Sequence, residues 1–169
     1  MAGYIPINGP IEASKTYVDN QLAARDVTFS LPEVTAITAD IEATGTMSFP
    51  IWARVENMET TITKVGQDVN FGLLIEPKMK TIEHRWAQSQ IDSSGNVKTI
   101  GCKAFLRCIP TTVPGIEAVL GEATENEIVY TVTRYNLFVD GKELLLIDKL
   151  SGTIKFNGKD YSSGAKNLL

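Results

Sequence analysis

The sequence predicts a mainly β fold of two packed antiparallel sheets, sandwich-like or barrel-like, with one short α-helix. Three observations predict it. Several segments alternate apolar and polar side chains with the period of a strand, and the clearest of them is 97–109. Hairpin turn sequences separate such segments, with Asp140-Gly141 as the strongest. The segment 67–76 is the best helix candidate, because it has the spacing and the boundaries of a helix.

Length and composition fit a single domain, which we expect to span 1–169. The chain has 169 residues, 43% apolar and 21% charged, as is ordinary for a globular protein that buries a core without disulfides. Its net charge of -4 lacks the basic surplus of a typical nucleic-acid-binding protein. No segment approaches the ~18 uninterrupted apolar residues of a membrane span, and no secretory signal is visible. We therefore expect a protein made in the cytosol without membrane anchoring.

The first half of the chain predicts an arm followed by strands. Residues 1–26 are weakly patterned and predict an N-terminal arm, within which 14–24 is either a short helix or extended. The segment 33–43 alternates apolar and polar residues, which predicts a half-buried strand. The remaining segments are a glycine-containing loop at 43–48 and two further strands at 49–55 and 58–65.

The second half predicts one helix and three hairpins. Asp68 can cap the helix, and Pro77 ends it. The first hairpin has arms at 78–91 and 97–109, longer than the roughly five or six residues usual for a strand. Each arm has one polar face, which predicts a sheet that continues beyond the monomer or a face exposed to water. The other segments are a loop at 111–127 with four glutamates and no basic residue, hairpins at 128–139 with 142–148 and at 153–156 with 159–161, and an extended C-terminal arm at 162–169.

No catalytic constellation stands out in the sequence. There is no nucleophile elbow, P-loop, dinucleotide-binding or zinc-protease motif. The single histidine, His84, lies on the apolar side of its strand, which favours a core or interface position. Asp40 and Glu42 share one strand face but are only two residues apart, which favours a solvated face over a glycosidase pair. We expect no enzymatic activity, no cofactor and no metal site.

The cysteines and tryptophans are the remaining candidates for a site. Cys102 and Cys108 share a strand face but lie roughly 20 Å apart along it, too far for a disulfide, so we expect buried thiols. Trp52 and Trp86 have apolar neighbours, which favours core packing. Stacking of a sugar on these rings, as in a monomeric carbohydrate-binding β-sandwich, stays open as an alternative.

The C-terminal part of the sequence resembles a known family. The segment 129–148, VYTVTRYNLFVDGKELLLID, followed by IKFNG at 154–158, resembles the major tail tube protein of contractile-tailed bacteriophages and of the related R-type bacteriocins. The order of elements over 34–169 fits the same family. The resemblance implies six-membered rings that stack helically into a rigid inner tube. Each subunit would give four long strands to an inter-subunit β-barrel around the lumen.

The resemblance also implies a function and partners. A contractile sheath would drive the tube through the envelope of the target cell, and in a phage DNA would pass through the lumen without specific binding. Expected partners are further copies of the chain and the sheath, tape measure, baseplate and tail terminator proteins. The expected location is the virion tail, or a bacteriocin particle, assembled in the cytoplasm of the bacterial host. The tube or ring of a non-contractile tail or of a secretion system stays open as an alternative.

The alternation along each strand indicates which side chains would face the lumen of such a tube. The wall would be mildly acidic, and a negative wall repels phosphates. The lumen-facing candidates are Thr38, Asp40, Glu42, Glu59, Thr61, Thr63, Glu83, Arg85, Lys103 and Arg107. The candidates for contacts between rings are Thr44, Gly45, Thr46, Met47, Glu117, Glu122 and Glu125.

Overall fold

The computed structural model describes residues 3–169 and consists mainly of β-strands. A ten-stranded antiparallel sheet makes up most of the molecule, and two further strands form a separate sheet. The strands are arranged in two layers packed face to face, which are called the back layer and the front layer below. The predicted fold class of packed antiparallel sheets is confirmed.

The back layer contains the long strands. Its members are β1 Ile7–Val18, β2 Gln21–Arg25, β7 Lys80–Ile91, β8 Val97–Thr112, β9 Glu125–Val139, β10 Lys142–Asp148, β11 Thr153–Phe156 and β12 Lys159–Asp160. They neighbour one another in the order β12-β11-β10-β9-β8-β7-β1-β2. The predicted long hairpin is β7–β8, whose strands have 12 and 16 residues. The predicted bounds of β10 and β11 are confirmed.

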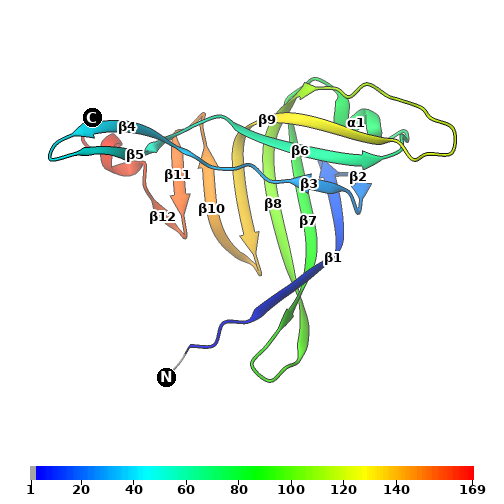
Figure 1. Cartoon of the computed structure of the whole chain (residues 1–169), viewed down its shortest axis with the longest axis horizontal. Coiled ribbons are helices and arrows are strands. Elements are labelled where there is room, and N and C mark those ends of the chain that lie inside the picture. Colours follow the sequence, from blue (N-terminus) through cyan, green and yellow to red (C-terminus); the bar gives the residue numbers. More distant parts are fainter. Residues whose placement is uncertain (1–2) are drawn as a thin grey trace.

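The front layer is a ribbon of shorter strands. Its members are β3 Thr28–Ser30, β4 Ala36–Glu42, β5 Thr46–Val55 and β6 Met58–Val65. β4 pairs with β5, and β3 pairs with β6. β6 also pairs with the first half of β9, whereas the second half of β9 pairs with β10, so the sheet folds over at β9. Figure 1 shows the ribbon crossing in front of the long strands of the back layer.

The hydrophobic core lies between the two layers. It includes Met58 and Ile62 of β6 and Ile82 of β7, all fully buried. The ring of Phe29 in β3 stacks on the ring of His84 in β7, with 4.2 Å between their centroids. This contact fixes the inner side of the front layer against the inner side of the back layer. The outward sides of the two layers therefore point in opposite directions.

The predicted helix is present but shorter than expected. Helix α1 spans Phe71–Ile75. Asp68 was predicted to cap the helix, but the N-cap residue is Asn70, two residues later. Asp68 instead accepts a hydrogen bond from the amide of Phe71 at 3.0 Å, from the turn before the helix. The same carboxylate accepts a hydrogen bond from Lys64 at 2.7 Å. The hydroxyl of Tyr130 donates to the carbonyl of Leu74 at 2.7 Å and satisfies a carbonyl at the helix end.

The N-terminal arm expected at 1–26 is largely a hairpin. Strands β1 and β2 are joined by Asp19 and Asn20, both with positive φ, at 48° and 68°. The inner side of β1 carries Ser14 and Thr16, which are buried although polar. Because these side chains interrupt the apolar pattern, the alternation of this strand was not visible in the sequence. Residues 1 and 2 of the expected arm lie outside the described residues.

Two further expectations are corrected. The strand at 33–43 was expected to be half buried, but β4 is exposed from its second residue to its end because the hairpin β4–β5 extends beyond the back layer. The C-terminal arm expected at 162–169 contains a short helix, α2 Ser163–Lys166. Lys166 holds it in place by donating to the carbonyls of Ser151 and Gly152, at 3.1 and 2.6 Å.

None of the helices within residues 3–169 has the length and apolar character needed to cross a membrane.

Candidate functional site

The outward side of the front layer, here the front face, is polar. Thr61 and Thr63 lie on the opposite side of β6 from buried Ile62, and their partners on β9 extend the same face. On β4, Ile37 borders a depression with Ile154 of the back layer, so Thr38 points outward. The polar residues of the front face include Thr28, Ser30, Thr38, Asp40, Glu42, Glu59, Thr61, Thr63, Glu127 and Thr131, and Val129, the partner of Thr61, lies among them.

The front face is acidic. The ten polar residues named for it include four carboxylates and no lysine or arginine. Two of the carboxylates accept hydrogen bonds from neighbouring side chains, since Ser48 donates to Asp40 at 2.5 Å and Asn57 donates to Glu59 at 3.2 Å. A surface of this kind attracts cations and repels phosphates.

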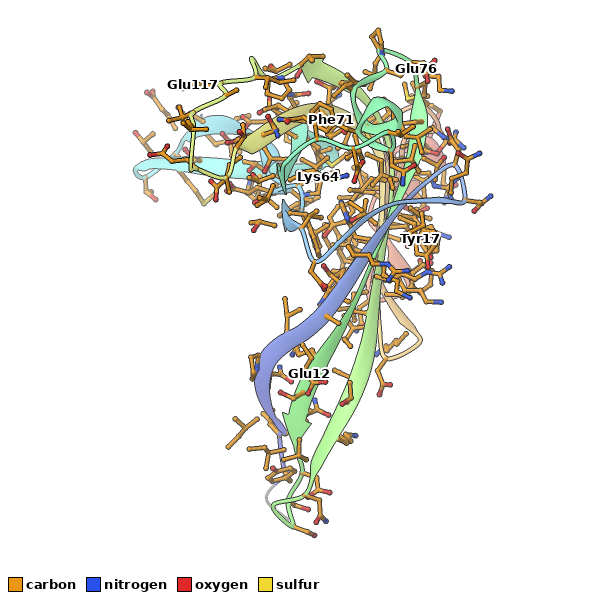
Figure 2. The ribbon with its side chains drawn as sticks, turned by 90° about the vertical axis from the view of Figure 1, so that its right-hand side faces the viewer. Glu12, Tyr17, Lys64, Phe71, Glu76 and Glu117 are labelled. Atoms are coloured by element: carbon orange, nitrogen blue, oxygen red, sulfur yellow. The ribbon has the colours of Figure 1, made fainter. Side chains whose placement is uncertain are left out.

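The outward side of the back layer, here the back face, is basic and partly aromatic. The register places Lys15, Arg85 and Lys103 directly beside one another on β1, β7 and β8, and places Arg107 beside Arg134 on β8 and β9. The back face includes Lys15, Tyr17, Thr81, Glu83, Arg85, Lys103, Phe105, Arg107, Arg134, Asn136 and Phe138, and it continues onto β10 with Glu143, Leu146 and Asp148. Figure 2, a side view, shows Tyr17 on the side of the molecule opposite to the loop that carries Glu117.

Three carboxylates lie on the back face by register: Glu83 on β7, and Glu143 and Asp148 on β10, beside Phe138 and Arg134. Glu83 is buried, and it pairs with the guanidinium of Arg85. The hydrogen bond to Glu83 raises the pKa of Arg85. The guanidinium also lies 4.7 Å from the centre of the Tyr17 ring. Within residues 3–169, Lys15, Lys103, Arg107 and Arg134 form no ion pair.

The ten lumen-facing candidates do not share one surface. Thr38, Asp40, Glu42, Glu59, Thr61 and Thr63 lie on the front face, whereas Glu83, Arg85, Lys103 and Arg107 lie on the back face. Because the layers pack with their inner sides together, the two groups point away from each other. The alternation correctly separated the outward from the inward side chains of each strand. It cannot show whether a strand belongs to the front layer or to the back layer.

The hairpin β4–β5 projects from the body with an uncovered apolar side. The pairs that form this side are Ile37 with Ile51, Ala39 with Phe49, and Ile41 with Met47. The large side chains among them are 37% to 55% exposed. Only the base of the hairpin is packed, where the ring of Trp52 meets Phe156 edge-on at 5.3 Å.

The candidates for contacts between rings lie at two separate places. Thr44, Gly45, Thr46 and Met47 are exposed at the tip of the hairpin β4–β5. Glu117, Glu122 and Glu125 are exposed in and beside the loop that joins β8 to β9. Figure 1 shows the hairpin tip and this loop at opposite ends of the long axis of the molecule.

The reactive side chains of the core are shielded. His84 is fully buried, bonds Thr16 at 2.9 Å, and has its pKa lowered to about 4 by burial. The free thiols Cys102 and Cys108 are buried, as predicted, and burial raises the pKa of Cys108 to about 12. Within residues 3–169, no three histidine, cysteine or acidic side chains are grouped to hold a metal ion.

Comparison with known proteins identifies a family. The profile described as phage tail tube protein FII matches residues 10–169. No curated protein sequence matches the chain significantly.

Solved structures from contractile injection particles have a similar fold. The sheath-tube complex of an extracellular contractile injection system, PVC, in its extended state contains a chain with a TM-score of 0.53 and 14% identity, covering 78% of this chain and 91% of that one. The sheath/tube terminator of the same system gives a TM-score of 0.52 and 16% identity, with coverages of 81% and 99%. The tube-terminating cap of the anti-feeding prophage AFP gives 0.52 and 14%, with coverages of 82% and 94%.

Proposed function

The chain belongs to the phage tail tube protein FII family and is a tail tube subunit, and we propose that its copies form six-membered rings stacked into the inner tube of a contractile tail. The observation that carries this proposal is the projecting hairpin β4–β5, whose apolar side has no cover within the described chain. The tube acts as a passive conduit and performs no catalysis.

The hairpin requires a neighbouring copy. A two-stranded hairpin on its own is marginally stable in water, and exposing five large apolar side chains on one side is unfavourable. The apolar side of the hairpin faces the same way as the inner side of the front layer, because Ile37 lines the same depression as Ile154 of the back layer. Figure 1 shows the hairpin reaching past β12, where the back layer ends. A neighbouring subunit supplies the missing layer beneath it.

The front face lines the lumen. It follows the ribbon from β3 to the tip of the hairpin, and the polar residues named for it include four carboxylates and no cation. In a phage this wall keeps DNA from adhering during passage, since phosphates are repelled along its length. Of the ten candidates, the six on the front face are retained and the four on the back face are excluded from the lumen.

Contacts between rings involve the two ends of the subunit. The hairpin tip and the loop with Glu117 lie at opposite ends, so one copy meets the next head to tail. Such heterologous contacts generate rings and open helical stacks, whereas a self-complementary patch generates closed dimers.

The partners follow from the tube. A sheath surrounds it and a terminator closes it, in keeping with the similar folds found in a sheath-tube complex and in a tube terminator. A tape measure protein and a baseplate complete the tail, which is assembled in the cytoplasm of the bacterial host.

Negative-stain microscopy and cysteine labelling test the proposal. The purified chain should form rings or tubes with rising concentration. Tubes of Glu59→Cys are treated with biotin-maleimide and then with streptavidin. Because streptavidin is too large to enter the lumen, it should not bind along the walls of these tubes. A protein that stays monomeric at high concentration and binds sugars would overturn the assembly. Tubes decorated along their length through position 59 would overturn the assignment of the lumen.

A further inference from the structure

The back face has a charge arrangement that the isolated subunit compensates only in part. Lys15, Arg85 and Lys103 stand side by side on three adjacent strands. Like charges directly opposite each other across a sheet destabilise it. Of these three cations, only Arg85 forms an ion pair with a carboxylate within residues 3–169. A second cationic pair, Arg107 of β8 beside Arg134 of β9, lies further along the face. Asp148 of β10 stands next to Arg134 but forms no ion pair with it within residues 3–169.

A hollow lies between the cations. Its volume is about 320 Å3, and Phe105, Phe138, Arg107 and Arg134 contribute to its walls. The rings of Phe105 and Phe138 meet edge-on at 5.8 Å. Asn136 also lines the hollow, and its side-chain oxygen is buried without a hydrogen-bond partner. The hollow therefore combines an apolar wall, an unused polar group and cations at its rim.

We propose that the back face docks an acidic, extended segment of a partner protein on the outer wall of the tube. Along β8, Lys103, Phe105 and Arg107 alternate outward, so the two cations are about 13 Å apart with an aromatic ring between them. An extended peptide has the same spacing. Acidic side chains at its first and fifth positions meet Lys103 and Arg107, and an apolar side chain at its third position enters the hollow.

A polypeptide fits this face better than a nucleic acid does. Glu83 lies directly beside Phe105, opposite the uncharged third position of the peptide. A nucleic acid carries a phosphate at every nucleotide and would be repelled there. The hollow is lined by phenylalanine, arginine and asparagine and accepts a side chain. The inference rests on the proposed function in one respect. If the front face lines the lumen, the back face points outward, away from any DNA inside the tube.

The test uses a fluorescent peptide with the sequence Glu-Thr-Leu-Thr-Glu between neutral flanks. Anisotropy is measured with unassembled protein and with tubes, so that the result does not depend on whether tubes form. The double variant Lys103→Glu, Arg107→Glu should bind the peptide at least about tenfold more weakly than wild type. The matched control Lys98→Glu, Lys142→Glu has the same net charge but leaves the back face intact, and it should change binding less than about twofold.

The neutral variant Lys103→Gln, Arg107→Gln guards against misfolding caused by charge reversal, and it should give an intermediate loss. A peptide with glutamine in place of both acids should lose binding to wild type. Equal binding by the wild type and the charge-reversed variant, or no binding at all, would overturn the inference. Tighter binding of a duplex DNA oligonucleotide than of the peptide would overturn it in favour of a nucleic acid.

Streptavidin labelling separates this inference from the proposed function. Tubes of Lys103→Cys should be decorated along their length. Bare Lys103→Cys walls would place the back face inside the tube and overturn the inference, although the tube itself would stand. Failure of the wild type to form any tube would overturn the proposed function, and the peptide measurements on unassembled protein would still decide the chemistry of the back face.

Discussion

The hairpins β4–β5 and β9–β10 have similarly alternating sequences, but the apolar side of β9–β10 is buried and that of β4–β5 is exposed. On the inner side of β9–β10, Tyr135 and Ile147 are buried against the core. On the corresponding side of β4–β5, Ile41 is 44% and Phe49 is 50% exposed. Alternation therefore specifies a strand with an apolar side, and it does not specify what covers that side. For β9–β10 the cover is the same chain, and for β4–β5 we infer that it is another copy.

The same apolar side chains thus stabilise different states. Burying a valine, leucine, isoleucine or phenylalanine is worth about 1.5–3 kcal/mol. For β9–β10 this contribution belongs to the folding of the monomer. For β4–β5 it is available only when a neighbour binds, so it favours assembly and not folding.

The largest effect should come from truncating the buried hairpin. Ile147→Ala removes a fully buried side chain and should lower the free energy of unfolding by about 2–5 kcal/mol, because the cavity adds to the lost burial. The matched change Ile41→Ala on the exposed hairpin should cost less than about 0.5 kcal/mol. Urea denaturation of unassembled protein measures both. Similar losses from the two changes would mean that the hairpin β4–β5 is already covered in the monomer.

Acid should weaken the body through His84. Burial lowers the pKa of His84 in the folded chain to about 4, below the usual 6.5 that the unfolded chain retains. Between these values the unfolded chain binds more protons, so stability is full above about pH 6.5 and falls as the pH drops towards 4. At about 1.4 kcal/mol for each unit of pKa, the loss approaches roughly 3 kcal/mol.

Denaturation midpoints between pH 7 and 4 measure this slope, and His84→Gln should flatten it. The carboxylates of Asp68, Asp92 and Asp160 have lowered pKa values, so their stabilising contributions are lost only as the pH falls below the usual 3.8, outside this window. An unchanged slope in His84→Gln would show that protonation of this ring does not control acid stability.

Polar substitution on the exposed hairpin should act on assembly alone. Phe49→Ser removes an apolar side chain from the face that a neighbour covers. It should raise the critical concentration for tube formation by about 10- to 100-fold, which corresponds to about 1.5–3 kcal/mol. The unfolding midpoint of the monomer should stay the same. Sedimentation of tubes at graded concentrations measures the effect, with Thr38→Ser on the polar side of the same hairpin as the control. Tubes that form as readily with serine at position 49 would leave the hairpin without a role in assembly.

Much of the fold was predictable because local sequence determined it. Asp140 and Gly141 adopt positive φ values of 50° and 78°, as a two-residue hairpin turn requires, and Asn157 and Gly158 do the same. The hairpin β1–β2 was missed because Asp19-Asn20 is a weaker turn signal and because Thr16 occupies an inner position. That threonine is satisfied by a bond to His84, 68 residues away, which no local pattern reveals.

The candidate site was predictable only in part. The alternation of β6 and of β8 correctly gave the outward side of each strand, including Thr61 and Lys103. It could not show that these strands belong to opposite layers, because that depends on the fold of the sheet at β9 and on the stacking of Phe29 on His84. For the same reason the basic back face was not recognised, since its cations come from strands far apart in the chain.

The smallest effect compares the turns of the two hairpins. Gly141 has a φ of +78°, which side-chain-bearing residues adopt at a cost, so Gly141→Ala should destabilise the monomer by about 1 kcal/mol. Gly45 has no positive φ, and a Cβ there would meet nothing within 4 Å, so Gly45→Ala should leave the monomer within about 0.5 kcal/mol of wild type. Thermal unfolding measures both. If Gly45→Ala nevertheless raises the critical concentration for assembly, the tip lies tightly against a neighbouring ring, and unchanged assembly would exclude a close contact at that residue.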